Sequence, residues 1–207
     1  MMKELFVNFI DSNNISCELK VNISNRFLKI PAIGFLAVNY DISENSKFIL
    51  ASRDEYFKTV DGNREVVPGV VVYINNDELK VINGIQRPND VMVAENGNFI
   101  INDWMSSKEL NGTFYAINSE LKILLKKKFN SNLGKNAISE NGEYALLETL
   151  VSKSEDGNSI FFFDLKNSEL LWRKTREYGN IKEFTLDTSN RVLKINYLNN
   201  RISNYNF

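Results

Sequence analysis

The sequence contains no histidine, and this absence excludes more functions than any other feature of its composition. Ser-His-Asp and Cys-His catalytic groups, histidine general bases and the commonest side-chain ligand of transition metals are all ruled out. Any chemistry would therefore depend on carboxylates, lysine, tyrosine or the single cysteine, Cys17. One cysteine cannot form an intramolecular disulfide, which favours a reducing setting inside the cell.

Strong charge and long apolar segments are also missing. Lys and Arg together number 25 and Asp and Glu 26, so a net charge of −1 steers the protein toward neither nucleic acid nor acidic ligands. No apolar run approaches the roughly 18 residues that cross a bilayer, and the first residues lack the apolar stretch of a signal peptide. We therefore expect a cytoplasmic protein with no nucleic-acid or membrane partner, and 207 residues predict a single domain spanning 1–207.

A phrase consisting of a polar turn and an apolar strand occurs four times. The copies read SENSKFIL, AENGNFII, SENGEYAL and, more loosely, DTSNRVLK, and they begin at residues 43, 94, 139 and 187. Consecutive starts are thus 51, 45 and 48 residues apart. A period of this length is typical of repeat arrays whose unit is a four-stranded sheet.

Each repeat predicts four short strands in sequence, which we denote a to d, and no segment has a convincing helical period. In the second unit these strands are residues 90–93, 98–103, 112–117 and 121–129. Residues 5–21 and 181–198 each read as half a unit, and pairing them would close a ring and remove exposed sheet edges. We therefore predict an all-β fold, a small β-propeller of four or five four-stranded blades closed by pairing of the N- and C-terminal strands. A β-sandwich of repeated hairpins is the alternative.

One junction between units resembles a known family. Residues 84–104 contain Arg87-Pro88-Asn89, an apolar strand, the turn Asn96-Gly97 and a strand that ends at Asp103. This order resembles the blade junctions of gluconolactonase and NHL-type propellers. The resemblance implies a propeller, and in gluconolactonase-like members a metal site of carboxylates and asparagine performs lactone hydrolysis.

The b–c connections are longer than the other turns and are predicted to gather on one face. Long loops on a rigid scaffold commonly carry binding, and aromatic residues and arginine are enriched in binding hot spots. We predict that this face binds a partner, although the same aromatic side chains could simply pack their loops. The predicted contact residues are Arg53, Asp54, Glu55, Tyr56, Phe57, Trp104, Met105, Arg176 and Tyr178.

A second candidate site consists of acidic residues near the predicted central channel. Asp103 and Glu148 fall at the same late position of strand b, and Asp90 lies in strand a of the second unit. Carboxylate oxygens suit Ca²⁺ or Mg²⁺. The alternative is that these carboxylates are solvated or paired with lysine.

Two smaller features have structural interpretations. The run Lys126-Lys127-Lys128 falls on a predicted outermost strand, where lysine guards against edge-to-edge aggregation. Cys17 lies on an alternating apolar strand and is predicted to be a small buried side chain.

Together these features favour a non-catalytic protein-binding module without a cofactor, in concrete form an enzyme inhibitor or a toxin-neutralising immunity protein. Tyr56, Phe57 or Trp104 would insert into the partner, while Asp54 and Glu55 would oppose a basic active site. The alternative is a lactonase-like hydrolase that uses Ca²⁺ or Mg²⁺ at Asp90, Asp103 and Glu148. Sugar binding by loop aromatics is less favoured, because the aromatic positions do not repeat.

Overall fold

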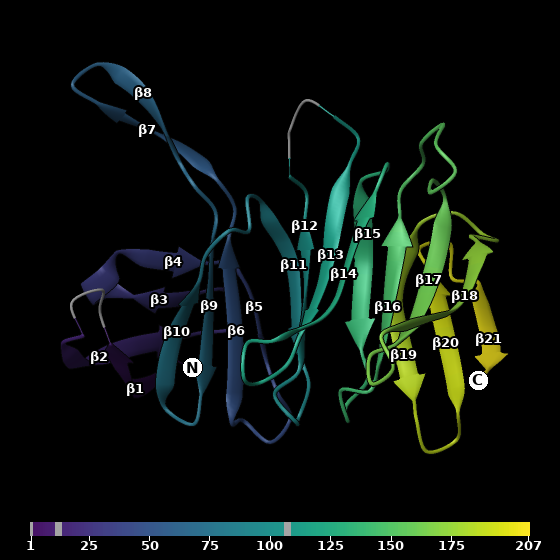
Figure 1. Cartoon of the computed structure of the whole chain (residues 1–207), viewed down its shortest axis with the longest axis horizontal. Coiled ribbons are helices and arrows are strands. Elements are labelled where there is room, and N and C mark those ends of the chain that lie inside the picture. Colours follow the sequence, from purple (N-terminus) through teal and green to yellow (C-terminus); the bar gives the residue numbers. More distant parts are fainter. Residues whose placement is uncertain (1, 11–13, 106–108) are drawn as a thin grey trace.

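The computed structural model describes residues 2–10, 14–105 and 109–207, so the predictions that concern residues 11–13 and 106–108 lie outside the described residues. The predicted all-β class is confirmed, since strands make up the regular structure in these ranges except for one short 3₁₀ helix, η1 (Pro31–Ile33) (Figure 1). In the same ranges, no helix has the length and hydropathy needed to cross a membrane.

The second, third and fourth repeats each form an antiparallel sheet whose strands follow the chain order. The second sheet consists of β11 (Pro88–Val93), β12 (Phe99–Asp103), β13 (Gly112–Ile117) and β14 (Ile123–Phe129). The third consists of β15 (Leu133–Ile138), β16 (Tyr144–Thr149), β17 (Ser159–Asp164) and β18 (Glu169–Thr175). The fourth has three strands, β19 (Ile181–Asp187), β20 (Val192–Tyr197) and β21 (Ile202–Asn206).

The first repeat belongs to a sheet of eight strands. Its own strands are β5 (Asn39–Ile42), β6 (Phe48–Arg53), β9 (Val70–Asn75) and β10 (Glu78–Ile82). The N-terminal segment adds β1 (Lys3–Ile10), β2 (Ser16–Ile23), β3 (Leu28–Ile30) and β4 (Phe35–Ala37). The order is β4-β3-β2-β1-β10-β9-β6-β5, with β1 parallel to β10.

The predicted closure of a ring by the two termini is therefore wrong. Strand β1 pairs with β2 and β10, whereas β21 pairs with β20. None of the sheets in the described ranges closes, and the prediction of uniform four-stranded blades holds only for the second and third repeats.

The N-terminal strands cover one face of the first repeat because its strand β6 is apolar on both faces. Leu50 faces the core shared with the second sheet, whereas Ile49 and Ala51 face the opposite side. In the described residues the N-terminal strands join the first repeat's own sheet, and Val7 and Val21 of these added strands pack onto that side. The eight strands of this single sheet therefore enclose one shared core.

The last sheet ends the array in the opposite way, with a polar outer face. On β20, Leu193 and Ile195 are buried against the third sheet, and Lys194 and Asn196 alternate with them on the other side. Lys194 pairs with Thr185 and Asn204, so polar side chains continue across the sheet. A polar terminal face needs no further sheet to cover it, which is how open repeat arrays end.

The predictions for the lysine run and for Cys17 have opposite outcomes. Strand β14, which carries the three lysines, is the edge strand of its sheet as expected. Cys17 is exposed, contrary to prediction. Cys17 lies on the same face of β2 as the buried Leu19 and Val21. It is at the far end of the β1–β2 hairpin, however, where no other sheet in the described residues covers it.

Candidate functional site

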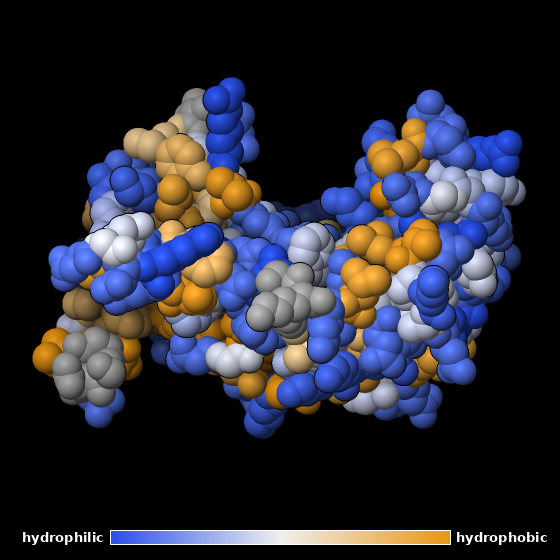
Figure 2. Space-filling model, turned by 90° about the horizontal axis from the view of Figure 1, so that it is seen from above, coloured by the Kyte–Doolittle hydropathy of each residue, from blue (hydrophilic) through white to orange (hydrophobic). Residues whose placement is uncertain are grey.

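The long connections between strands b and c lie at one edge of the array. Figure 1 shows the β6–β9 and β16–β17 connections projecting from the same side of the molecule. Figure 2 views this side and shows an open notch between the N-terminal and C-terminal halves. This edge contains the predicted contact residues.

The longest connection is a β-hairpin, which the sequence analysis treats as a loop. Strands β7 (Tyr56–Val60) and β8 (Asn63–Val67) pair only with each other among the described strands, and they extend beyond the body; we call this hairpin the arm (Figure 1). Asp61 and Gly62 both have positive φ angles at its tip, which is typical of a two-residue hairpin turn. The pattern Val60-Asp61-Gly62-Asn63 is the sequence signal that could have revealed it.

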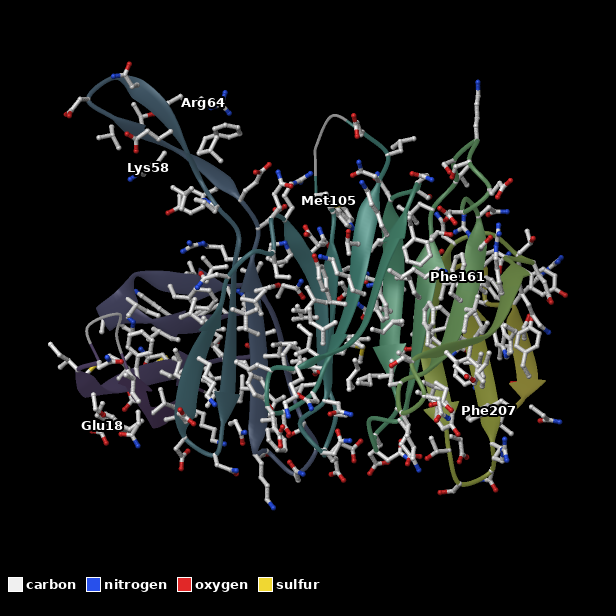
Figure 3. All side chains as sticks on the ribbon, in the orientation of Figure 1. Glu18, Lys58, Arg64, Met105, Phe161 and Phe207 are labelled. Atoms are coloured by element: carbon white, nitrogen blue, oxygen red, sulfur yellow. The ribbon has the colours of Figure 1, made fainter. Side chains whose placement is uncertain are left out.

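The arm presents apolar side chains to solvent. Phe57 and Val66 lie directly opposite each other on the two strands and are 52% and 54% exposed. Tyr56 is 43% exposed. The guanidinium carbon of Arg64 lies 3.7 Å from the centre of the Phe57 ring, and Figure 3 shows Lys58 and Arg64 on the arm, away from the body.

Ion pairs and ring contacts fix the base of the arm. Arg87 pairs with Asp54 at 3.2 Å and with Glu55 at 3.3 Å. The Arg53 guanidinium lies 5.0 Å from the ring centre of Tyr56. Both predicted acidic contact residues therefore already have a cationic partner within the chain.

The remaining predicted contact residues are partly or wholly structural. The Trp104 indole Nε1–H donates to the Leu133 carbonyl at 3.0 Å, and the Thr113 hydroxyl contacts the Met105 sulfur at 3.0 Å. Arg176 is buried in an ion pair with Glu148, and Tyr178 packs edge-on against Tyr197. These side chains do not join Tyr56 and Phe57 in one exposed patch.

A cavity of about 470 Å³ lies where the innermost strands of all four sheets meet. Its wall combines apolar side chains, amides, two carboxylates and one ammonium that belong to different sheets. The lining residues are Asn39, Asn89, Asp90, Trp104, Leu133, Gly134, Lys135, Glu148, Leu150, Asn180 and Ile181.

β-Bulges shape this cavity. In β11, β15 and β19, the ladder with the next strand gains one extra residue near the cavity end. The extra residue is Asn89 in β11, and in β15 Gly134 and Lys135 together oppose Glu148. A bulge re-aims side chains that a regular strand would turn to the other face, and bulges are enriched beside functional sites.

Asp103 and Glu148 hold the backbone around these bulges. Asp103 accepts hydrogen bonds from the backbone N–H groups of Gln86, Arg87 and Met105. The sequence predicts their equivalent positions in the repeats, but it offers metal binding or solvated, lysine-paired carboxylates as their roles and not this bracing of the backbone.

Glu148 makes an equivalent set of bonds one sheet further along. It accepts the N–H groups of Lys135 at 3.0 Å and Ile181 at 3.3 Å, and it pairs with Arg176 at 2.5 Å. A Cβ on Gly134 would lie 2.5 Å from the Glu148 carboxylate, so glycine is needed for this approach.

The predicted metal triad does not assemble in the described residues. Asp90 and Glu148 line the same cavity, but together with Asp103 they form no group of mutually close carboxylates. The oxygens of Asp103 and Glu148 already accept hydrogen bonds from the chain. These donors do not fit a divalent cation site.

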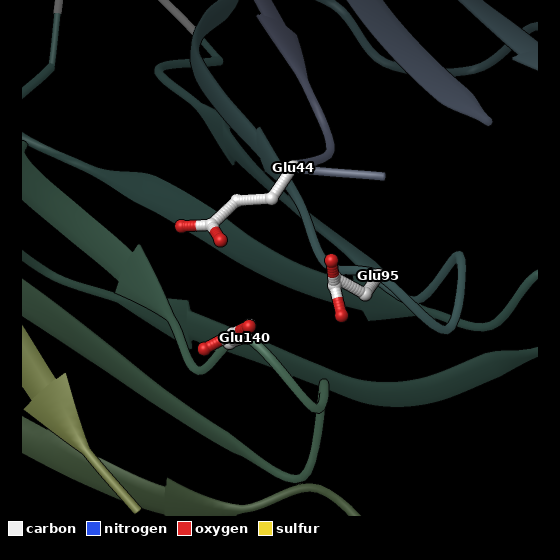
Figure 4. Close-up of side chains that lie close together, drawn as sticks. All are labelled: Glu44, Glu95 and Glu140. Carbon is white, nitrogen blue, oxygen red and sulfur yellow. The ribbon is translucent and has the colours of Figure 1, made fainter. Parts of the chain in front are cut away.

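Another set of carboxylates does converge, at the opposite ends of the inner strands. Glu44, Glu95 and Glu140 occupy equivalent turn positions in three repeats, and one oxygen of each lies within 4.8 Å of the others (Figure 4). Bonds between turns bring them together, because Asn45 Nδ2 donates to the Glu95 carbonyl and the Glu95 N–H donates to the Glu140 carbonyl.

Two aspartates near the cavity are desolvated. Burial raises the pKa of Asp90 above its usual value of 3.8, although the charge of Lys135 opposes this shift. Burial also raises the pKa of Asp41, against a hydrogen bond of 2.8 Å from the Val93 N–H. No ion pair to Asp90 forms in the described residues.

No protein-family model matches the sequence, and no curated protein matches it. The functional assignment therefore depends on the geometry of the arm and the cavity.

Proposed function

We propose that this protein is a non-catalytic module that binds another protein through the arm. The observation that supports this most directly is the exposed pair Phe57 and Val66 on a hairpin that pairs with no other strand in the described part of the chain. Large apolar side chains gathered on a projecting element are typical of interaction sites. The braced base would hold the arm ready for binding, which lowers the ordering cost of association.

An enzyme inhibitor or a toxin-neutralising immunity protein is the concrete form of this proposal. A two-stranded projection is narrow enough to enter a concave surface on a partner, with Phe57 leading. Arg87 already pairs with Asp54 and Glu55, so we assign recognition to the apolar pair and the Arg64 cation rather than to acidic residues.

The propeller resemblance enters the proposal in a modified form. We propose that the four sheets are propeller-like units in an open arc. Their inner strands β5, β11, β15 and β19 jointly line the cavity, and the repeated turns hydrogen-bond from one unit to the next. The hydrolase alternative is not proposed further, because two of its three metal ligands, Asp103 and Glu148, already accept hydrogen bonds from the chain.

The test is affinity capture from the lysate of the native host, comparing the wild-type chain with Phe57→Ala/Val66→Ser. Glu18→Gln is a matched control, because Glu18 is exposed on β2 and has no ion pair in the described residues (Figure 3). We expect one stoichiometric partner that the arm variant loses and the control keeps.

Purified components then give the affinity. Truncation of an interface hot spot costs at least about 2 kcal/mol, so the arm variant should weaken binding about 30-fold or more. A partner bound equally well by both variants would contradict the proposal.

A further inference from the structure

The cavity between the inner strands contains an unusual pair of charges. Asp90 and Lys135 belong to adjacent sheets and both line the cavity, yet they form no ion pair. The Lys135 side chain is exposed and makes no hydrogen bond in the described part of the chain. A carboxylate and an ammonium that face one cavity without pairing leave both charges available to a ligand.

The neutral part of the wall adds two further kinds of contact. Asn39 and Asn89 have side-chain amides without hydrogen-bond partners in the described residues. Leu133, Leu150 and the Trp104 ring supply apolar surface. The wall thus combines apolar surface with convergent polar groups, and a volume of about 470 Å³ is within the range of small-molecule sites.

We propose that this cavity binds a small zwitterion of the amino-acid or dipeptide class. The ligand's ammonium group contacts Asp90, its carboxylate contacts Lys135, and its apolar side chain lies against Leu133, Leu150 and Trp104. The site is separate from the arm and does not depend on the protein-binding proposal.

The local structure shows how this geometry is maintained. Asn136 Nδ2 donates to the Asp90 carbonyl at 3.3 Å, and Glu148 holds the Lys135 N–H at 3.0 Å. Both charged residues thus lie on backbone that neighbouring units fix in place. Retaining a desolvated Asp90 costs stability, and proteins often accept such a cost at a binding site.

The test uses the full chain labelled with ¹⁵N and titrated with L-leucine and with L-leucyl-L-leucine. The protein has two tryptophans. The Trp104 indole N–H donates to the Leu133 carbonyl on the cavity wall, whereas the Trp172 ring packs at a tilt against Phe162 and Tyr205 outside the cavity. We expect saturable shifts of the Trp104 indole signal and an unmoved Trp172 signal. The probe with the tighter binding distinguishes an amino acid from a dipeptide.

Ligands with one charge removed identify the role of each residue. N-acetyl-L-leucine lacks the ammonium and L-leucinamide lacks the carboxylate, so each should bind about 10-fold or more weakly than L-leucine. Lys135→Gln should weaken N-acetyl-L-leucine but not L-leucinamide, and Asp90→Asn should do the reverse. Lys135 is exposed, so its replacement is expected to leave folding intact.

Any of three results would overturn the proposal. One is a Trp104 signal that neither leucine nor dileucine moves. Another is equal binding of L-leucine and its two blocked derivatives, and the third is equal binding by wild type and both variants.

Discussion

The Arg176 guanidinium forms a buried ion pair with Glu148, whose carboxylate holds together two of the strands that line the cavity. The two side chains are 1% and 3% exposed, and their atoms lie 2.5 Å apart. Glu148 also accepts two backbone N–H groups from β15 and the start of β19. Breaking such a pair leaves a charge without compensation in the interior.

Arg176→Met should therefore lower the free energy of unfolding by about 3–5 kcal/mol. The double variant Glu148→Gln/Arg176→Met removes both charges and should recover part of this loss. Urea denaturation measures both values. An Arg176→Met variant as stable as the wild type would show that the pair is not needed.

The pKa of Asp90 predicts a pH dependence of stability. Burial raises this pKa in the folded state above the unfolded value of 3.8, so between the two values the folded state binds more protons. Stability consequently falls as pH rises through this window, and the loss is complete above the folded pKa. The charges that bear on Asp90 are Lys135, which lowers the pKa, and Asp41, which raises it.

Asp90→Asn removes this ionisation, so its free energy of unfolding near pH 7 should exceed that of the wild type. The difference should shrink toward about pH 4. Thermal melts across this range measure it, with Glu18→Gln as the exposed control. A variant that is less stable than the wild type near neutral pH contradicts the desolvation argument.

The repeated turn is the element that joins the units. Gly97 has a φ of +81°, and a Cβ there would lie 2.7 Å from the Phe48 ring and 2.8 Å from the Tyr73 hydroxyl. Both neighbours belong to the core between the first and second sheets. Glycine at position 97 therefore allows both the positive φ angle of the turn and the close packing between the first and second sheets.

Gly62, at the tip of the arm, has a positive φ angle but no packing neighbours in the described residues, so it isolates the backbone effect from the packing effect. Its φ is +79°, but nothing lies within 4 Å of an added Cβ. Gly62→Ala should cost about 1–2 kcal/mol through backbone strain alone. Gly97→Ala should cost about 1–3 kcal/mol more, because it also overpacks the core. Chemical denaturation of both variants checks the difference, and equal costs would rule out the packing contribution.

Element by element, the sequence predicted the strands inside the repeats closely. The strand predicted at residues 159–164 is found with those bounds, because turn residues flank an uninterrupted apolar run. The arm was missed, because Tyr56–Val60 and Asn63–Val67 are largely exposed and carry no buried stripe. The sequence predicted Asp90 and Glu148 near a central channel, and both line the cavity. The bulges that shape its wall could not be predicted, because they depend on contacts between repeats.

At the scale of the whole molecule, the side-chain pattern of β20 explains why the predicted ring does not close. A closed ring would need an apolar face on both sides of every sheet. Lys194 and Asn196 make the outer face of the last sheet polar, and the N-terminal strands cover the outer face of the first. The alternation of Leu193 and Ile195 with these polar residues is the sequence signal that indicates an open end.

An apolar outer face on the last sheet should therefore allow a second molecule to pack against it. Lys194→Leu/Asn196→Ile extends an apolar stripe across β20, and we expect concentration-dependent self-association in size-exclusion chromatography with light scattering. Lys153→Leu, in an exposed connection, is the control. A double variant that stays monomeric would show that the polar face does not limit the array.

The arm's tip also makes the chain a scaffold for displaying foreign peptides. Asp61 and Gly62 turn the chain far from the hydrophobic clusters, and the strands below them pair only with each other. Inserted residues would lengthen a solvent-exposed turn, and the entropic cost of closing a loop grows only with the logarithm of its length. A guest sequence placed there would be held in a hairpin on a rigid base, while the cores between the four sheets stay untouched.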